Sequence, residues 1–281
     1  MIDFGPAGCC ELMESRGINI MQVPKFLSEL GLKTFEYPLT HGINIGQEKA
    51  KVIGDEFKKF NISLSVHAPY YINLANPDDV MAEKSFGYII SSMKIANAMG
   101  ADRVIFHPGA LMGQTREEAQ ALILKRLTDL VSRLNQQNLF SGIYLCPETM
   151  GKHGQCGTVS EVAEMCKISE RLIPTIDFGH VNAFMLGALN SVEAFEGIFK
   201  TLTSVLGERG HIIHGHFSRI EFGPKGEIKH LNFDSPLEFG PDFKLLNIAM
   251  KNCHISGRIV CESHGNQTED SLEMQKDYLK V

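Results

Sequence analysis

The chain has 281 residues, of which 43% are hydrophobic and 21% charged, and no apolar run is long enough to span a membrane. Its formal net charge of −6 excludes a general electrostatic attraction to nucleic acid, so such binding would need a local basic patch or bound cations. Seven cysteines without a CxxC pair, and a beginning with no basic stretch before an apolar one, lead us to expect a cytoplasmic protein.

Short β-rich runs alternate along the chain with longer runs of helical apolar spacing. The β-rich runs cover residues 2–5, 33–38, 63–69, 103–109, 142–149, 173–180, 212–218 and 258–263. Residues 115–138 predict an amphipathic helix, because apolar side chains recur at intervals of three and four: Leu124, Leu127, Val131 and Leu134. Thr115 and Glu118 resemble a capping box at its start. Residues 192–210 predict another helix that stops at a glycine.

Eight strand–helix units follow one another without a linker or a low-complexity tract. This order favours a single (β/α)8 barrel, or TIM barrel, that spans residues 1–281, and the length is normal for that fold. An open, doubly wound parallel sheet would show the same alternation, so the sequence leaves that alternative open.

Polar side chains end six consecutive predicted strands, the third to the eighth: His67, His107, Glu148, Asp177, His216 and Glu262. The carboxyl ends of the strands form one rim of a (β/α)8 barrel, and active sites are built there. A lone histidine at a strand end is more often a core residue than a ligand. Six metal-binding side chains on consecutive strands indicate a metal site.

The chemistry of these side chains narrows the choice of metal. Imidazoles mixed with carboxylates suit Zn²⁺, and also Mn²⁺ or Fe²⁺, better than Mg²⁺ or Ca²⁺. His180 and His230 raise the candidate ligands to eight, and one ion takes about four protein ligands, so we expect two or three ions. Clustered ions activate water at neutral pH and stabilise the attacking and leaving oxygens of a phosphoryl displacement.

Several short segments, in this order, resemble the endonuclease IV family, the apurinic/apyrimidinic-site nucleases among the xylose-isomerase-like barrels. They are HAPYYINLA, FHPGA, PETMGK, DFGHVNA, HGHFS and VCES, and the resemblance covers about residues 3 to 275. It implies a zinc-dependent hydrolase of base excision repair. Such an enzyme cuts the phosphodiester 5′ to abasic sites in double-stranded DNA, and we expect it to act as a monomer.

The resemblance also distributes the candidate ligands over three metal ions. The three sets are His67, His107 and the bridging Glu148; Glu148, Asp177, His216 and Glu262; and His180 with His230. Glu148 is expected to orient or deprotonate the attacking water, and Glu262 is the second candidate catalytic residue.

The third set departs from the family pattern. The family normally places an aspartate two residues before the last histidine, where this chain has Ile228, while Glu227 is displaced by one position. Alternate residues of an extended chain share a face, so Glu227 is expected to face away from His230 unless the loop bends.

Three further residues are candidates for substrate binding. Tyr70 and Tyr71 match positions that press into the duplex in the family, and aromatic faces can stack on bases or wedge into a gap. A pair of tyrosines packed at the barrel rim is an equally good interpretation. His41 stands where the family commonly has an arginine or polar residues against the DNA strand.

Two other functions compete with the nuclease. A single-metal sugar isomerase or epimerase on the same barrel would need only the quartet Glu148, Asp177, His216 and Glu262. It does not need His67, His107 and His180, and their joint presence favours the nuclease. A non-catalytic binding protein is disfavoured, because it has no use for eight polar groups that are costly to bury.

Overall fold

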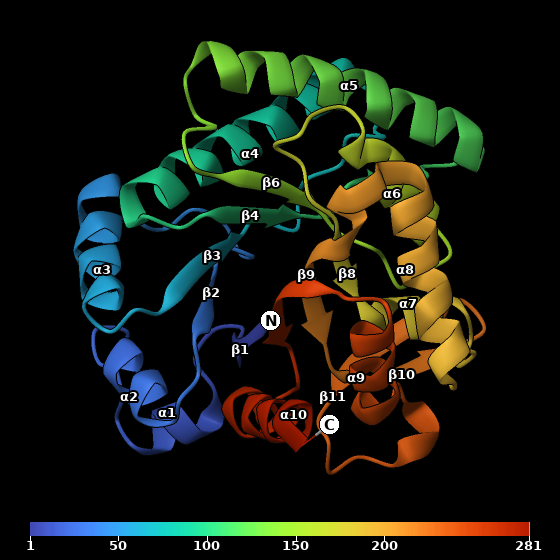
Figure 1. Cartoon of the computed structure of the whole chain (residues 1–281). Coiled ribbons are helices and arrows are strands. Elements are labelled where there is room, and N and C mark those ends of the chain that lie inside the picture. Colours follow the sequence, from blue (N-terminus) through green and yellow to red (C-terminus); the bar gives the residue numbers. More distant parts are fainter. Residues whose placement is uncertain (281) are drawn as a thin grey trace.

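A computed structural model describes residues 1–280, with Leu237 described by its backbone alone, and shows a ring of strands surrounded by helices (Figure 1). The eight strands of the ring are β1 (Ile2–Pro6), β2 (Thr34–Pro38), β3 (Ser63–His67), β4 (Arg103–Phe106), β6 (Tyr144–Pro147), β8 (Thr175–Asp177), β9 (Ile212–Phe217) and β12 (Ser256–Cys261). They pair in parallel in two arcs, β1-β12-β9-β8 and β2-β3-β4-β6.

Isolated parallel bridges close these arcs into a barrel, and two of them include a carboxylate residue. Ala7 pairs with Glu36 between β1 and β2, and Glu148 pairs with Thr175 between β6 and β8. Each of these two bridges therefore includes a carboxylate that faces the candidate site described below. The ring excludes an open sheet and confirms the (β/α)8 barrel predicted from the sequence.

Helices cover the outside of the ring. They are α1 (Glu11–Ser15), α2 (Val23–Glu29), α3 (Gln47–Lys59), α4 (Asp79–Met99), α5 (Arg116–Gln136), α6 (Val159–Cys166), α7 (Phe178–Phe184), α8 (Val192–Leu206), α9 (Phe243–Asn252) and α10 (Gln267–Lys280), with 3-10 turns η1 (Gly207–His211) and η2 (Leu237–Phe239). The capping box of Thr115 and Glu118 at the start of α5 is present as predicted. The helix predicted over 192–210 ends earlier, at Leu206, because Gly207 adopts a φ of 60°.

The strand predicted over 173–180 is shorter than expected. β8 ends at Asp177, and α7 begins at the next residue. The Oδ1 atom of Asp177 accepts a hydrogen bond from the backbone N–H of His180 at 2.8 Å, which caps the helix. His180 therefore lies in the first turn of a helix and close to the strand end, instead of continuing along the strand.

Two short antiparallel pairs accompany the barrel. β10 (Arg219–Gly223) and β11 (Gly226–Leu231) form a hairpin after β9, and β5 (Gly109–Ala110) pairs with β7 (Gln155–Cys156). The hairpin contacts α7, and its Gly226 forms a bridge with Lys152 in the loop after β6. These contacts hold the hairpin beside the carboxyl ends of the strands. Among residues 1–280, no helix combines the length and the apolar character needed to cross a membrane.

Candidate metal centre

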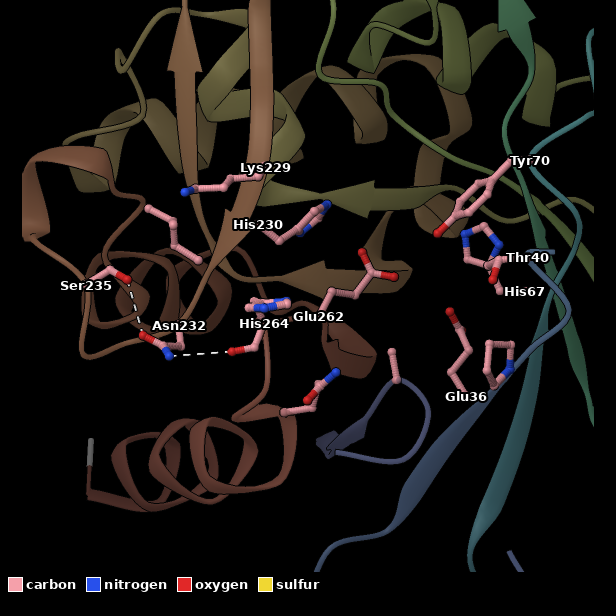
Figure 2. Close-up of a pocket in the computed structure, with 14 residues that line it drawn as sticks. Glu36, Thr40, His67, Tyr70, Lys229, His230, Asn232, Ser235, Glu262 and His264 are labelled. Atoms are coloured by element: carbon pink, nitrogen blue, oxygen red, sulfur yellow. Dashed lines mark hydrogen bonds between the residues drawn. The ribbon is translucent and has the colours of Figure 1, made fainter. Parts of the chain in front are cut away.

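All eight predicted metal ligands lie at the carboxyl-terminal end of the barrel. His67 and Asp177 end β3 and β8, and the residues that directly follow β4, β6 and β12 are His107, Glu148 and Glu262. The other three come from β9, α7 and the hairpin: His216, His180 and His230. In Figure 2 the side chains of His67, Tyr70 and Glu262 point toward one another across the cavity.

Glu148 is the centre of this cluster, and its side chain is fully buried. Its Oε2 atom lies 3.1 Å from Nε2 of His67 and 3.2 Å from Nε2 of His107. Its Oε1 atom lies 3.1 Å from Nδ1 of His216 and 3.4 Å from Nδ1 of His180. One carboxylate thus contacts four imidazoles that come from four different elements of the barrel.

The potential ligand atoms fall into overlapping groups whose members all lie within 4.8 Å of one another. Three groups are His67, His107 and Glu148; Glu148, Asp177, His216 and Glu262; and Asp177, His180 and His230. Glu148 is shared by the first two groups, and Asp177 is shared by the last two. The structure therefore brings Asp177 to the third group as well, which the sequence interpretation did not include.

Backbone carbonyls orient two of these imidazoles. Nδ1 of His67 lies 2.9 Å from the carbonyl oxygen of Ala68, and Nδ1 of His180 lies 2.9 Å from that of Thr149. A carbonyl oxygen only accepts, so each Nδ1 carries a hydrogen and the Nε2 atom of a neutral ring presents a lone pair. The lone pair of His67 then faces Glu148 Oε2, another acceptor, at 3.1 Å. Two acceptors at this separation need a proton or a cation between them.

Asp177 gives a second sign of a missing positive partner. Its side chain is buried, and its Oδ2 atom has no hydrogen-bond partner among the described residues. Nδ1 of His180 lies 3.3 Å from this oxygen but makes its hydrogen bond to the carbonyl of Thr149. A buried carboxylate oxygen without a partner is costly, and coordination of a cation would remove that cost. The donor set of imidazoles and carboxylates fits a transition-metal ion such as Zn²⁺.

Neighbouring charges in the cluster outweigh the effect of burial on the pKa values of His67 and Glu148. Burial lowers the pKa of His67, but the neighbouring Glu148 outweighs it and raises the pKa to about 9. Burial raises the pKa of Glu148, but His216 and His107 outweigh it and hold that pKa well below its usual value. The cluster therefore favours ionised carboxylates that are balanced by positive charge, which metal ions supply when they displace the protons.

The pKa of Glu262 is shifted in the opposite direction to that of Glu148. Burial raises its pKa to about 8, and the negative charges of Glu148 and Asp177 act in the same direction against the lowering effect of His216. A carboxyl group that lines a cavity and has a pKa near neutrality is suited to proton transfer. The catalytic role of Glu262 stays a prediction of the sequence analysis.

Two cavities open onto the cluster, with volumes of about 640 Å³ and about 360 Å³. Both are lined by His67, Tyr70, His230 and Glu262. The larger cavity extends over β11 to Asn232 and Ser235, as Figure 2 shows. The smaller one reaches the loop after β6. His67, His230 and Glu262 are thus accessible from both cavities, whereas Glu148, Asp177 and His216 are fully buried.

The three predicted substrate-binding residues lie in different surroundings. Tyr70 is half exposed and stands over the cluster, with its ring centroid 5.6 Å from that of His107. Tyr71 is also exposed, but it packs on Tyr88 at 5.7 Å and lines neither of the two cavities. His41 packs against the edge of Tyr70 at 5.8 Å and lines a separate, smaller cavity. Tyr70 is the best placed of the three to touch a substrate.

A β-bulge decides the position of Glu227. Glu221 pairs with Lys229, but Phe222 pairs with Glu227, so Ile228 is an extra residue without a partner. The bulge reverses the alternation of side chains, and Ile228 is exposed while the Oε2 atom of Glu227 comes to 3.6 Å from Nε2 of His180. The chain does bend, as the sequence analysis required for Glu227 to approach the third group.

Gly151 makes this approach possible. A Cβ atom on Gly151 would lie 2.8 Å from the Cβ of Glu227 and 3.1 Å from Cδ2 of His180, closer than side chains normally pack. The backbone N–H of Glu227 also donates to the carbonyl of Gly151 at 3.0 Å. The glycine of the PETMGK segment thus lets the hairpin dock against the cluster.

Glu36 is the residue that sequence reasoning missed. It lies in β2 and is 1% exposed, and its carboxylate contacts His214 and His216 inside the barrel. The sequence does contain one indication, because Glu36 is the single charged residue in the predicted strand segment TFEYP. It was not recognised because Glu36 stands two residues before the strand end, one layer below the rim.

The family model of the xylose isomerase-like TIM barrels matches residues 24–278, and the chain belongs to this family. An uncharacterised protein of Methanocaldococcus jannaschii is 30% identical over 264 residues, which cover 94% of this chain and 92% of that protein. A probable endonuclease 4 of Aquifex aeolicus is 24% identical over 213 residues, which cover 73% of this chain and 74% of that protein.

The solved structures with the same fold include an epimerase-like protein and an endonuclease. A D-tagatose 3-epimerase-like protein has a TM-score of 0.74 at 20% identity, and the match covers 99% of this chain and 97% of that one. Endonuclease IV of Thermus thermophilus has a TM-score of 0.65 at 16% identity, with 99% and 98% covered. At these identities the likeness shows the fold and leaves the reaction to be argued from the site.

Proposed function

We propose that the protein is a metal-dependent endonuclease that hydrolyses the phosphodiester 5′ to abasic sites in double-stranded DNA. The observation that carries this proposal is the arrangement of His67, His107 and His180 around Glu148, at 3.1 to 3.4 Å from its carboxylate oxygens. A single-metal enzyme has no need of these three imidazoles. The probable endonucleases 4 among the curated relatives support the same choice.

In this proposal the three groups of ligand atoms hold two or three ions, and the donor set suits zinc. Glu148 joins the first group to the second, and Asp177 joins the second to the third. Bound ions would supply Lewis-acid stabilisation of the negative charge that develops on the phosphate oxygens, and they would lower the pKa of water.

The protein's own groups would position the substrate and move the proton. The carboxylate of Glu148 orients the attacking water between the imidazoles, and Glu262 lines both cavities, where it can accept or return a proton. Tyr70, above the cluster, offers an aromatic face to a base or a sugar beside the lesion. Lys152 lines the smaller cavity and provides local positive charge for DNA phosphates, despite the net charge of −6.

A single-metal sugar isomerase or epimerase remains the alternative, and a specific observation favours it. Glu148, Asp177, His216 and Glu262 form a complete group of four ligands on their own. The larger cavity, of about 640 Å³, is of a size that holds a small molecule. The number of bound ions separates the two functions.

We expect protein purified without added metal or chelator to contain at least two transition-metal ions per chain. The reason is that the buried cluster offers eight ligand side chains, twice the number that one ion uses. Elemental analysis by mass spectrometry measures the stoichiometry, and chelator-treated protein gives the baseline. Active protein with one ion or fewer would favour the isomerase.

The third ion is expected to depend on Glu227. Replacing Glu227 by alanine removes the carboxylate that lies 3.6 Å from His180, and the ion held by His180 and His230 should then bind more weakly by about 10- to 100-fold, as when supporting ligands are lost elsewhere. Competition with a fluorescent chelator measures each affinity in turn.

The matched control for this variant is Glu221→Ala in the same hairpin, whose carboxylate pairs with Lys229 on the exposed part of the hairpin. Its metal affinities should equal those of the wild type. Equal affinities in Glu227→Ala and the wild type would show that Glu227 contributes nothing to the third site.

A further inference from the structure

Thr149 lies at the seam where the two arcs of the barrel meet. β6 and β8 are the edge strands of these arcs, and Thr149 follows the end of β6 by two residues and is fully buried. The bridge between Glu148 and Thr175 joins the two strands, and the backbone N–H of Thr149 donates to the carbonyl of Thr175 at 3.0 Å. Parallel strand pairing therefore reaches across the seam as far as this bond.

The next hydrogen bond of an ordinary parallel ladder is replaced. Bonds in a parallel pair follow one another at even spacing, so a continued ladder would join the N–H of Asp177 to the carbonyl of Thr149. Instead, this N–H donates to the side-chain oxygen Oγ1 of Thr149 at 2.9 Å. The same hydroxyl donates to the carbonyl of Asp177 at 3.3 Å. One side chain thus holds both backbone groups of Asp177.

The replacement leaves the carbonyl of Thr149 to a different donor. Nδ1 of His180 donates to this carbonyl at 2.9 Å, in the place that the N–H of Asp177 would take in a continued ladder. The ring is held with its Nε2 atom toward Glu227, at 3.6 Å. Thr149 therefore contacts two members of the third group of ligand atoms, Asp177 and His180, through two different atoms of its own.

Thr175 offers a comparison within the same seam. Its hydroxyl oxygen is also buried, but it has no hydrogen-bond partner among residues 1–280. The two threonines stand on facing sides of the seam and differ in what their hydroxyls bind. The connection from the seam to the ligand group therefore belongs to Thr149 in particular.

We propose that Thr149 is a positioning residue for the third metal group, because its hydroxyl removes the N–H of Asp177 from the strand ladder and its carbonyl then holds the ring of His180. The inference rests on the metal centre of the proposed function. It means that the seam of the barrel fixes Asp177 and His180 relative to each other before an ion binds between them and His230. Loss of a group that orients a metal ligand weakens metal affinity by about 10- to 100-fold.

Replacing Thr149 by valine tests the role of the hydroxyl, because valine is of nearly the same size and cannot bind the N–H of Asp177. We expect this N–H to turn to the carbonyl at position 149, as in an ordinary ladder, and to displace Nδ1 of His180. The affinity of the third group for Zn²⁺ should then fall about 10- to 100-fold in competition with a fluorescent chelator. A His230→Ala variant identifies the ion of that group, because it lacks one of the ligands.

Two control variants separate positioning from general damage to the barrel. Thr149→Ser keeps the hydroxyl and should bind the third ion as the wild type does. Thr175→Val removes the buried hydroxyl that has no partner, and all its metal affinities should equal those of the wild type. The ion held by His67 and His107 should keep its affinity in all three variants.

Several results would contradict the proposal. They are an unchanged affinity for the third ion in Thr149→Val, an equal loss in Thr149→Ser or Thr175→Val, and an equal loss for every ion. A wild type that binds no more ions than His230→Ala would also overturn it, because the third group would then hold no ion. Circular dichroism and thermal unfolding establish that the variants are folded.

Nuclear magnetic resonance of the zinc-loaded wild type decides the matter if Thr149→Val does not fold. A scalar coupling across a hydrogen bond between the amide nitrogen of Asp177 and the carbonyl carbon of Thr149 would show an ordinary ladder and overturn the proposal, and we expect no such coupling. The coupling from the amide of Thr149 to the carbonyl of Thr175 is the positive control. Should the variants behave as expected while the zinc-loaded wild type does not cleave abasic DNA, the nuclease function alone would be overturned.

Discussion

Replacing Glu148 by glutamine should reduce turnover by about 10³-fold or more while leaving the barrel folded. Both oxygens of Glu148 are in use, since Oε2 contacts His67 and His107 and Oε1 contacts His216 and His180. The amide of glutamine has one acceptor oxygen in place of two and no negative charge, so it can neither join two ions nor take a proton from water. Steady-state cleavage of a labelled duplex with one abasic analogue measures the loss.

The matched control is Glu161→Gln, because Glu161 is also a largely buried carboxylate but lies at the start of α6, where it pairs with Arg116. Its loss should affect stability and leave the rate of cleavage near that of the wild type. If Glu148→Gln kept a near-normal rate with its full content of metal, Glu148 would not have the bridging role.

The second large effect is expected from the double change of His67 and His107 to alanine. These two imidazoles belong to the group that Glu148 completes, and they take no part in the quartet that a single-metal isomerase would use. The variant should lose one ion and keep the other, and cleavage of the abasic duplex should collapse because the attacking and leaving oxygens lose their shared stabilisation. Elemental analysis and the cleavage assay are made on the same preparations.

Under the isomerase function, the wild type would not cut the duplex, and sugar interconversion would survive the double change. The control variant His211→Ala alters a histidine that bonds to the carbonyl of Cys253, away from the cluster, and should behave as the wild type. Metal-stripped and heat-inactivated wild type must accompany the assay, because abasic DNA also breaks spontaneously. Fully metallated wild type that does not act on abasic duplex at low salt would defeat the proposed nuclease function.

The barrel and the set of polar residues at its rim could be predicted because they depend on local periodicity. Alternating strand and helix patterns identify the eight units, and a parallel barrel brings the carboxyl ends of all its strands to one rim. Residues at those ends, such as His67, Asp177 and Glu262, must then be neighbours, although about a hundred residues separate them in the chain. The barrel topology alone therefore predicts that these side chains lie together, and side-chain packing does not enter the prediction.

The positions of Glu227, His180 and Glu36 were decided by the tertiary structure. A strand pattern places Glu227 and His230 on opposite faces, but the bulge at Ile228 and the contact with Gly151 turn Glu227 toward the cluster. The capping hydrogen bond from His180 to Asp177 likewise replaces the expected end of a strand by the first turn of a helix.

The contact of Glu36 with His216 joins β2 to β9, and no pattern within either strand encodes it. Strand periodicity reports which face a side chain takes, so it could place both residues inside the barrel. The pairing arises only when the ring closes and brings those two faces within hydrogen-bond distance. By itself the sequence determined which chemical groups reach the rim of this protein, whereas the closure of the barrel decided that Glu36 of β2 lies 2.9 Å from His216 of β9.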